Sequence, residues 1–288
     1  MKKCLIVYFS QTGATQKVAE RIATGLRTAN YQVDLYNIKE KNPPDIMGYD
    51  LLGIGSPVYY YRPPFNVLDY VKKLPDAPEL ASFVFVLYGT FIGKCGNVLR
   101  EMLMHKKTRD VGYFYCQGSD YYVGYLKEGY LFSPDHPTND ELTQAERFGQ
   151  QVALRMNGEN YKSQEYDQSI FEVAYRLERF LTSRFYVKLL YSRMFRVDSK
   201  KCDKCCSLCM ELCPMKNIFK TENGKLIWKR NCLFCGTCEL NCPTGAIKSP
   251  ISWLIFRPFM KYNVHKASQD RSLDYVRVTC NSGKIKRM

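Results

Sequence analysis

The 288-residue chain has little of several features on which particular functions depend. It contains only three histidines, none of them in a predicted ligand loop or beside a carboxylate in a catalytic pattern: His105, His136 and His265. No apolar run approaches the ~18 residues that a transmembrane helix needs. A Gly-x-Gly-x-x-Gly fingerprint and a Walker loop are also missing, so neither direct use of NAD(P)H nor binding of a nucleoside triphosphate is expected.

The N-terminus superficially resembles a secretion signal but lacks its essential parts. Lys2 and Lys3 precede an apolar run of only six residues, 4–9, and no small-residue cleavage site follows. A buried strand explains this run better. We therefore expect a cytoplasmic protein without a transmembrane segment, and we do not expect structural disulfides.

Cysteine, by contrast, is abundant: the chain has 13, and most of them lie between residues 202 and 242. The second of two runs there, Cys232-x2-Cys235-x2-Cys238-x3-Cys242-Pro243, has the spacing of bacterial 4Fe-4S ferredoxins. Thiolates are soft ligands that suit iron–sulfur clusters. Structural zinc favours pairs of cysteine pairs rather than triplets closed by Cys-Pro, so the run indicates a cluster.

The first cysteine run is one residue longer than this spacing. Three of its cysteines are candidate ligands in any case: Cys202, Cys209 and Cys213. The remaining ligand is either Cys205 or Cys206, and the spacing does not choose between them. In two-cluster ferredoxins the fourth cysteine of each run ligates the other cluster. On this pattern the chain holds two 4Fe-4S clusters, Cys213 belongs with the first three cysteines of the second run, and Cys242 belongs with the first run.

The first half of the chain alternates between strand and helix patterns. Apolar runs typical of buried parallel strands occur at 4–9, 32–36, 51–55, 83–88 and 111–116. Helical patterns occur at 14–28, 65–73, 97–105 and 139–156, the last with Thr138 or Asn139 as its cap. This alternation predicts a doubly wound sheet whose ligand lies at the carboxyl ends of the strands.

A candidate phosphate loop follows the first strand and leads directly into a helix. Its residues are Ser10, Gln11, Thr12, Gly13, Ala14 and Thr15. The hydroxyls of residues 10, 12 and 15 are suited to surround an anion, and Gly13 allows a tight turn. The free N–H groups of the first helical turn complete the cradle.

Two further loops are expected at the same edge of the sheet, after the third and fourth strands. They supply Ser56, Pro57, Val58, Tyr59 and Tyr60, then Tyr88, Gly89, Thr90, Phe91, Ile92 and Gly93. Aromatic side chains beside glycine or proline offer faces on which a flat isoalloxazine ring stacks and N–H groups that reach its polar atoms. Three loops in this order, with one terminal phosphate site, favour flavin mononucleotide (FMN).

With these motifs the chain resembles flavodoxin-like domains fused to a bacterial-type two-cluster ferredoxin. The resemblance covers residues 1–157 and 201–249. It implies an α/β flavodoxin-like doubly wound parallel sheet of order 2-1-3-4-5, a helical linker and a small α+β ferredoxin-like domain. It also implies electron transfer as the activity. The chain departs from the pattern in the extra residue near Cys205 and in its basic charge, because single-domain flavodoxins are usually acidic.

We predict four segments: an FMN-binding domain at 1–157, a helical linker at 158–200, a two-cluster ferredoxin domain at 201–249 and a C-terminal extension at 250–288. The linker has an apolar helical stripe, made of Ile170, Val173, Ala174, Leu177, Phe180 and Leu181. We expect this helix to dock the ferredoxin domain near the flavin. The extension is expected to cover a domain interface, with contact to a partner as the alternative.

Positive charge is concentrated near the clusters: residues 201–288 hold 16 Lys and Arg against 6 Asp and Glu, within a net charge of +14 for the chain. No basic helix with base-reading residues accompanies this charge, so nucleic acid is not expected as a partner. A redox partner protein with an acidic docking face, or an anionic membrane surface, is favoured. The sequence leaves open whether the chain forms a homo-oligomer.

Two functions are compatible with these features. In the first, the protein is an electron carrier that passes electrons between two 4Fe-4S clusters and FMN, and on to a partner oxidoreductase. In the second, it is an FMN-dependent reductase of a small-molecule substrate, fed by its own clusters. The scarcity of histidine favours the carrier, although Tyr60 or Tyr121 would be available as a proton donor.

Overall fold

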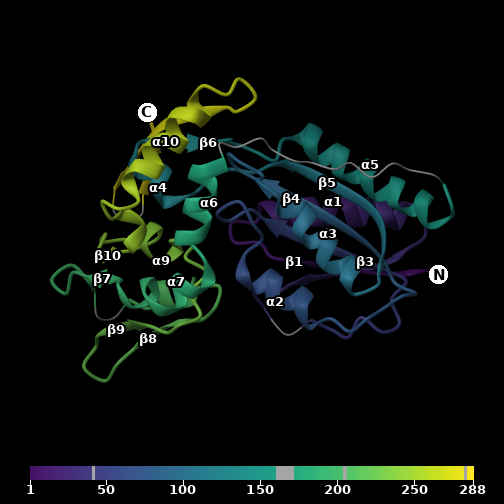
Figure 1. Cartoon of the computed structure of the whole chain (residues 1–288), viewed down its shortest axis with the longest axis horizontal. Helices are drawn as coiled ribbons and strands as arrows, with labels where there is room; N and C mark the ends of the chain where they lie inside the picture. Colours follow the sequence, from purple (N-terminus) through teal and green to yellow (C-terminus); the bar gives the residue numbers. More distant parts are fainter. Residues whose placement is uncertain (41–42, 160–171, 204–205, 282–283) are drawn as a thin grey trace. The chain divides into compact units, whose positions relative to one another are not determined.

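The computed structural model describes residues 1–40, 43–159, 172–203, 206–281 and 284–288. These residues form two compact units (Figure 1). The first comprises residues 1–119 and the chain from Asp135 to the end of α5; the second comprises Asp120–Pro134 and the described residues from 172 onward.

The first unit is built on five parallel strands in the order β2-β1-β3-β4-β5 (Figure 1). The strands are β1 (Lys3–Tyr8), β2 (Gln32–Asn37), β3 (Leu51–Pro57), β4 (Ala81–Tyr88) and β5 (Arg109–Gln117). Central strands β1, β3 and β4 are almost wholly buried, as expected for a parallel sheet covered on both faces. The predicted doubly wound sheet and its strand order are confirmed.

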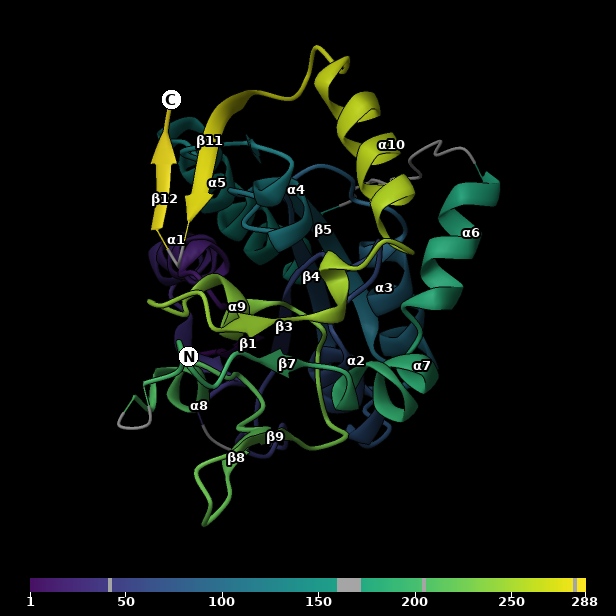
Figure 2. The ribbon, with the colours of Figure 1, turned by 90° about the vertical axis from the view of Figure 1, so that its left-hand side faces the viewer.

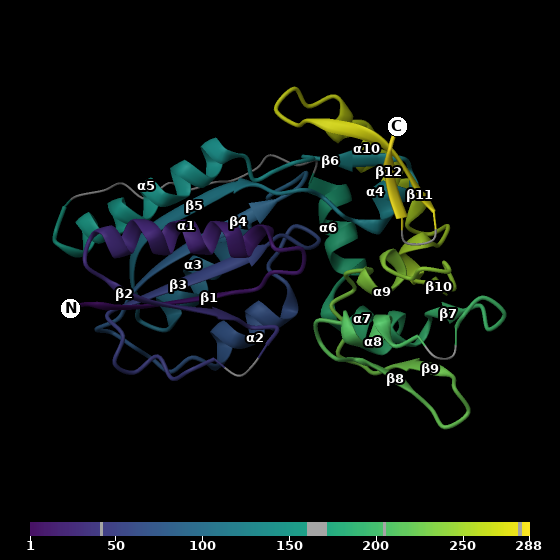
Figure 3. The same ribbon diagram turned by 180° about the vertical axis from the view of Figure 1, so that it is seen from behind.

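Four helices cover the two faces of this sheet (Figure 3). They are α1 (Ala14–Thr28), α2 (Phe65–Lys73), α3 (Cys95–His105) and α5 (Asn139–Met156). Helices α1 and α5 lie together, because Gly25 and Gly149 let their backbones approach closely. A Cβ atom on Gly25 would lie only 2.0 Å from the carbonyl oxygen of Glu146.

Residues 120–134, which the sequence analysis placed within the segment 1–157, belong to the second unit. They form α4 (Val123–Lys127) and β6 (Tyr130–Phe132). Strand β6 pairs antiparallel with β11 (Tyr275–Asn281), and β11 pairs with β12 (Lys284–Arg287). The segment therefore leaves the first unit after β5 and returns before α5.

The rest of the second unit contains the small α+β arrangement that the resemblance predicts. Two antiparallel pairs, β7 (Arg196–Val197) with β10 (Ile247–Lys248) and β8 (Ile218–Lys220) with β9 (Leu226–Trp228), accompany the short helices α8 (Leu208–Glu211) and α9 (Thr237–Leu240). Helices α6 (Glu172–Leu181), α7 (Arg184–Leu189) and α10 (Arg257–Ser268) complete it, with one-turn helices η1 (Tyr191–Arg193) and η2 (Pro250–Ser252) (Figure 2). In the described part of the chain, no helix is long and apolar enough to cross a membrane.

Candidate cofactor sites

The predicted phosphate loop has an ordered and open conformation at the carboxyl end of β1. Ser10 is buried, and its Oγ accepts hydrogen bonds from the backbone N–H groups of Gly13 (3.2 Å) and Gln16 (3.3 Å). Gly13 has φ of +92°, and a Cβ atom placed there would meet nothing within 4 Å. The space above Gly13 is therefore open at the N-terminus of α1, where N–H groups and the helix dipole favour an anion.

The hydroxyls of this loop differ in exposure. Thr12 is exposed, whereas Thr15 is buried with 3% of its surface accessible. Because a hydroxyl has two lone pairs and one O–H, Ser10 keeps its O–H for donation while it accepts the two backbone N–H groups. The loop thus presents both backbone N–H groups and hydroxyl groups as hydrogen-bond donors, and an anion site requires such donors.

The loop after β3 is a tight hairpin. Tyr59 and Arg62 exchange backbone hydrogen bonds of 2.9 and 3.2 Å, and the two residues between them, Tyr60 and Tyr61, have φ of +50° and +63°. The Tyr59 hydroxyl donates to the side-chain oxygen of Gln11, so this hairpin is joined to the phosphate loop. A positive φ at a bulky residue is strained and marks a turn that its surroundings hold in place.

The loop after β4 packs against the same hairpin. The rings of Tyr61 and Phe91 lie 6.0 Å apart, and a Cβ atom on Gly93 would lie 2.6 Å from the Tyr61 carbonyl oxygen. Glycine at position 93, with φ of +56°, permits this approach. The structure thus brings together residues from all three predicted loops at one edge of the sheet.

Two of the predicted ring contacts have side chains that are fully buried. Ser56 and Ile92 are each 0% exposed, and the Ser56 Oγ donates to the carbonyl oxygen of Pro57 at 2.8 Å. These side chains shape the loops from beneath. Pro57, Val58, Tyr59, Tyr60, Tyr88 and Gly89 are partly exposed.

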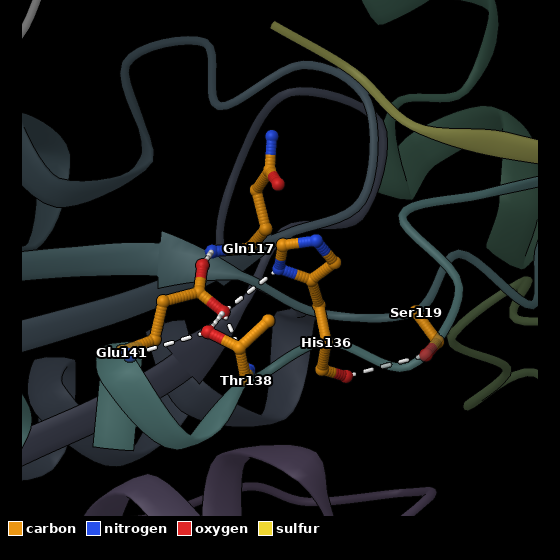
Figure 4. Close-up of polar contacts among 5 residues, drawn as sticks. All are labelled: Gln117, Ser119, His136, Thr138 and Glu141. Carbon is orange, nitrogen blue, oxygen red and sulfur yellow. Dashed lines mark hydrogen bonds and ion pairs between the residues drawn. The ribbon is translucent and has the colours of Figure 1, made fainter. Parts of the chain in front are cut away.

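A polar cluster around His136 and Glu141 lies at the carboxyl end of β5 (Figure 4). It was not predicted from the sequence. The Nδ1 atom of His136 lies 2.7 Å from one carboxylate oxygen of Glu141, which also accepts the backbone N–H of Thr138 at 2.7 Å. The other oxygen accepts the N–H of Gln117 at 3.0 Å. The statement that no histidine lies beside a carboxylate is therefore wrong for His136. The sequence shows that His136 and Glu141 are five residues apart, but it does not show the turn that brings the two side chains together.

Glu141 also begins helix α5. Its backbone N–H donates to the Thr138 hydroxyl at 3.3 Å, which makes Thr138 and Glu141 a reciprocal capping box. Of the two predicted caps, Thr138 is the N-cap and Asn139 is the first residue of the helix. One carboxylate therefore caps α5, holds the end of β5 and orients His136.

Eight of the nine described cysteines of the second unit separate into two electrostatic groups. The pKa of the Cys209 thiol is raised to about 11, first by burial and then by the neighbouring thiols of Cys206, Cys202 and Cys242. Burial likewise raises the pKa of Cys202, with Cys242 and Cys206 as the next causes. One group therefore consists of Cys202, Cys206, Cys209 and Cys242.

The second group is formed by Cys213, Cys232, Cys235 and Cys238, whereas Cys280, on β11, lies outside both groups. Burial is the first cause that raises the pKa of Cys238, followed by the thiols of Cys235 and Cys232, with Cys213 also raising it. Cys213 likewise raises the pKa of Cys232 and Cys235. This grouping of Cys213 with the second run, and of Cys242 with the first, has the crossed pattern of two-cluster ferredoxins.

Hydrogen-bond donors point at several of these sulfur atoms. The Sγ of Cys213 accepts from the N–H of Asn217, that of Cys232 from Phe234 and that of Cys242 from Ala246, each at 3.3 Å. Burial raises the pKa of Cys242, but its hydrogen bonds from Thr244, Ile247 and Ala246 outweigh burial and leave this pKa below its usual value. Such donors stabilise thiolate, the form that ligates iron.

The open choice in the first run falls partly outside the described residues. Cys205 lies outside them, whereas Cys206 lies with Cys202, Cys209 and Cys242. In the residues that the structure describes, no three His, Cys, Asp or Glu side chains converge on one metal ion. A cubane distributes its ligands over several irons, so its thiolates do not need to meet at one point.

Residues 120–134 contact the second cysteine run. The Lys127 ammonium pairs with the buried carboxylate of Glu239, which follows Cys238, and the other Glu239 oxygen accepts the N–H of Ser249 at 2.9 Å. A Cβ atom on Gly236 would lie 2.7 Å from the Val123 side chain. The inserted segment is therefore packed into the cysteine-rich core of the second unit.

Comparison with known families agrees with both halves of the chain. A flavodoxin domain matches residues 5–118, and a 4Fe-4S binding domain matches residues 226–248. The chain belongs to the flavodoxin family and carries a 4Fe-4S ferredoxin domain. The 4Fe-4S match in this flavodoxin–ferredoxin chain includes the second cysteine run only.

Separate relatives match the flavodoxin part and the ferredoxin part of the flavodoxin–ferredoxin chain. An uncharacterized protein of Methanocaldococcus jannaschii is 30% identical over 153 residues, which are 52% of this chain and 97% of that protein. An uncharacterized ferredoxin of the same organism is 44% identical over 45 residues, 15% of this chain and 71% of the ferredoxin. Among solved structures, an archaeal flavodoxin aligns with 54% of this chain and 99% of its own, at 18% identity and a TM-score of 0.43.

Proposed function

We propose that this protein is an electron carrier that passes electrons between two 4Fe-4S clusters and FMN, and on to a partner oxidoreductase. The division of the eight described candidate ligands into two groups of four, each with members from both cysteine runs, is the observation that carries the proposal. When bound, the clusters supply one-electron centres and FMN a centre that takes one or two electrons. The chain's own residues bind and insulate these groups.

FMN would be held by the three loops at the carboxyl edge of the sheet. The open space above Gly13 and the donors around it fit a terminal phosphate. The hairpin at Tyr59 and Tyr60 and the loop at Tyr88–Gly93 would enclose the isoalloxazine ring. Their mutual contacts, Tyr59 with Gln11 and Tyr61 with Phe91, support a preformed site.

The clusters would be held by the two cysteine groups, with Cys206 as the ligand in the first run. The N–H donors to the sulfur atoms of Cys213, Cys232 and Cys242 stabilise negative charge on the ligands. Such hydrogen bonds are one of the means by which proteins set the potential of a cluster. Cys209, Cys238 and Cys242 are buried and the other described candidate ligands are half-buried, so the surrounding chain would limit access of water to the clusters.

The path of the chain supports transfer within one molecule. Residues 120–134 begin three residues after the end of β5 in the first unit, and they pack against the second cysteine run through Lys127 and Val123. Covalent connection raises the effective concentration of one redox centre at the other, provided the connecting residues permit contact. The predicted docking of the two domains remains a proposal.

A second function, reduction of a small molecule at the flavin, is favoured by one observation. His136 is held by Glu141 at the same sheet edge as the candidate flavin loops. With its Nδ1 hydrogen-bonded to a carboxylate, an imidazole is fixed in orientation and its Nε2 becomes the atom for proton exchange. The carrier remains our primary proposal, because Glu141 already has a structural role in the cap of α5.

The cofactor content tests the proposal directly. Protein prepared without oxygen should contain about eight iron and eight sulfide per chain, the sum for two cubanes, and should release FMN rather than FAD. The matched control is the Cys213→Ser variant, which should lose the cluster of Cys232, Cys235 and Cys238 while keeping FMN. About four iron in the wild-type chain, or zinc in place of iron, would refute the two-cluster proposal.

A further inference from the structure

The second unit exposes an unusual number of large apolar side chains on neighbouring segments. On α6, Val173, Leu177 and Phe180 are 67%, 46% and 57% exposed. Phe185 and Leu189 on α7 are 66% and 51% exposed. Leu254 and Ile255, before α10, are 80% and 56% exposed. We call these seven residues the apolar face.

Contacts within the second unit hold the three segments of the apolar face together. The ring of Tyr191, two residues after α7, lies 5.4 Å from that of Phe256, which directly follows Ile255. Asn263 on α10 donates to the Glu178 carboxylate on α6 at 3.0 Å. Figure 2 shows α6, α7 and α10 along the same side of this unit.

The apolar side of helix α6 faces solvent, whereas the apolar side of an ordinary amphipathic helix is buried in the core. Val173, Leu177 and Phe180 follow the i, i+4, i+7 spacing of one helix face, yet this face is exposed. The inward face carries the buried carboxylate of Glu178, satisfied by Asn263. A charged side chain is therefore buried while apolar side chains are exposed, which is costly in water unless the apolar face has an occupant.

Positive charge predominates on the segments of the apolar face, although Glu172 begins α6 and the Glu128 carboxylate lies 3.9 Å from the Arg257 guanidinium. Residues 173–197 contain six Lys and Arg, and their only acidic residue is the buried Glu178. Residues 250–268 contain Arg257, Lys261 and Lys266 and no acidic residue. On α7, exposed Arg184 and Lys188 flank exposed Phe185 and Leu189. Alternation of cationic and apolar side chains on short amphipathic helices is typical of segments that lie in a membrane interface.

We propose that the apolar face binds the surface of an anionic lipid bilayer, so that the protein is a peripheral membrane protein during electron transfer. Leu254, Phe185 and Phe180 insert below the headgroups, while Lys188, Arg193 and Lys261 contact lipid phosphates. The arginine and lysine side chains are long enough to reach the headgroups while their stems lie along the apolar layer.

Lipid fits this face better than a protein does. The most exposed side chains come from a loop, Leu254, and from the outward face of short helices, Phe185 and Val173. A protein partner must offer a complementary pocket for each of these, whereas the acyl boundary of a bilayer accepts any apolar shape. An acidic protein face would also pair poorly with seven exposed apolar side chains. A bilayer with anionic headgroups matches both the apolar side chains and the positive charge around them.

Vesicle flotation tests the proposal with the full-length protein carrying its cofactors. The protein should float with phosphatidylcholine vesicles that contain about one third phosphatidylserine, and bind vesicles of phosphatidylcholine alone at least about tenfold more weakly. L254D and F185D should each weaken binding to the anionic vesicles at least about tenfold, because a buried apolar group is replaced by a charge. Both positions are exposed, so the cofactor absorbance of these variants should be unchanged.

The matched control is M47D, which places the same charge at a 71% exposed methionine in the first unit. Its vesicle binding should equal that of the wild-type chain. Failure of the wild-type protein to float, or equal flotation of L254D, F185D and wild type, would overturn the proposal. Self-association that L254D and F185D abolish, in the absence of vesicle binding, would identify the occupant as a second copy of the chain instead.

Discussion

At the residue scale, two adjacent cysteines carry the main ambiguity of the iron–sulfur site. The spacing of the first run allows Cys205 or Cys206, whereas the thiol of Cys206 interacts with those of Cys202 and Cys209. Spacing alone does not distinguish the two because an extra residue can be accommodated on either side of a ligand. Cys205 lies outside the described residues, and Cys206 is our proposed ligand.

We expect Cys206→Ser to remove about half of the iron and sulfide, since one cubane loses a thiolate ligand. Cys205→Ser is the matched neighbour and should retain the full content. Iron and sulfide analysis of the two variants, purified in parallel without oxygen, measures the difference. The reverse pattern, with Cys205→Ser deficient and Cys206→Ser intact, would assign the ligand to Cys205.

The phosphate loop gives a second residue-scale prediction. Thr12 is exposed in the loop that precedes α1, next to the open space above Gly13. Thr12→Leu should weaken FMN binding about tenfold or more, because it removes a hydrogen bond to a charged group and adds bulk. Thr12→Ser keeps the hydroxyl and should bind FMN within about threefold of the wild type. Fluorescence titration of apoprotein with FMN measures both, and equal affinity of the leucine variant would place the phosphate elsewhere.

At the scale of elements, the sequence predicts what local periodicity determines. The helices at 14–28, 65–73 and 139–156 have the predicted bounds, and the strands differ from prediction by at most two residues at either end. Buried apolar runs and helix caps are local signals, so one sequence suffices for them. The three candidate flavin loops follow from strand order, because the carboxyl ends of parallel strands lie at one edge.

Elements whose environment depends on distant residues were not predicted. Strand β6 at Tyr130–Phe132 pairs with β11 at Tyr275–Asn281, and three residues carry too little pattern to reveal such a partner. In the predicted apolar stripe of helix α6, Val173, Leu177 and Phe180 are exposed and Leu181 is half-buried. Ile170 and the side chain of Ala174 lie outside what the structure describes. Periodicity identifies an apolar face without identifying what covers it.

The inserted segment 120–134 gives an element-scale prediction. Lys127 on α4 is the cation paired with the buried carboxylate of Glu239, beside Cys238. Lys127→Met should lower the free energy of unfolding of the second unit by about 1–3 kcal/mol, since a buried carboxylate loses its partner. The loss of cluster absorbance on heating, measured without oxygen, should move to lower temperature.

The control for this prediction removes a positive charge that is exposed. Lys225→Met, in the turn between β8 and β9, should change the free energy of unfolding by less than about 0.5 kcal/mol. An equal shift in both variants would show that net charge, rather than the pairing of α4 with the cysteine-rich core, determines the stability of this unit.

At the scale of the whole molecule, a flavodoxin domain and a ferredoxin domain share one chain whose path crosses between the two units more than once. A simple fusion would cross once, at a linker. Here residues 120–134, from within the predicted flavodoxin segment, are part of the cysteine-rich unit. Under the proposed function, these covalent connections between the units would raise the effective concentration of each redox centre at the other.

Rapid mixing of the oxidised protein with a one-electron reductant tests this central proposal most directly. Cluster absorbance should bleach first, and flavin reduction should follow at a rate that does not change over about a tenfold range of protein concentration, as transfer within one chain requires. A flavin rate proportional to protein concentration would show transfer between molecules, and reduced clusters beside flavin that stays oxidised would contradict the account.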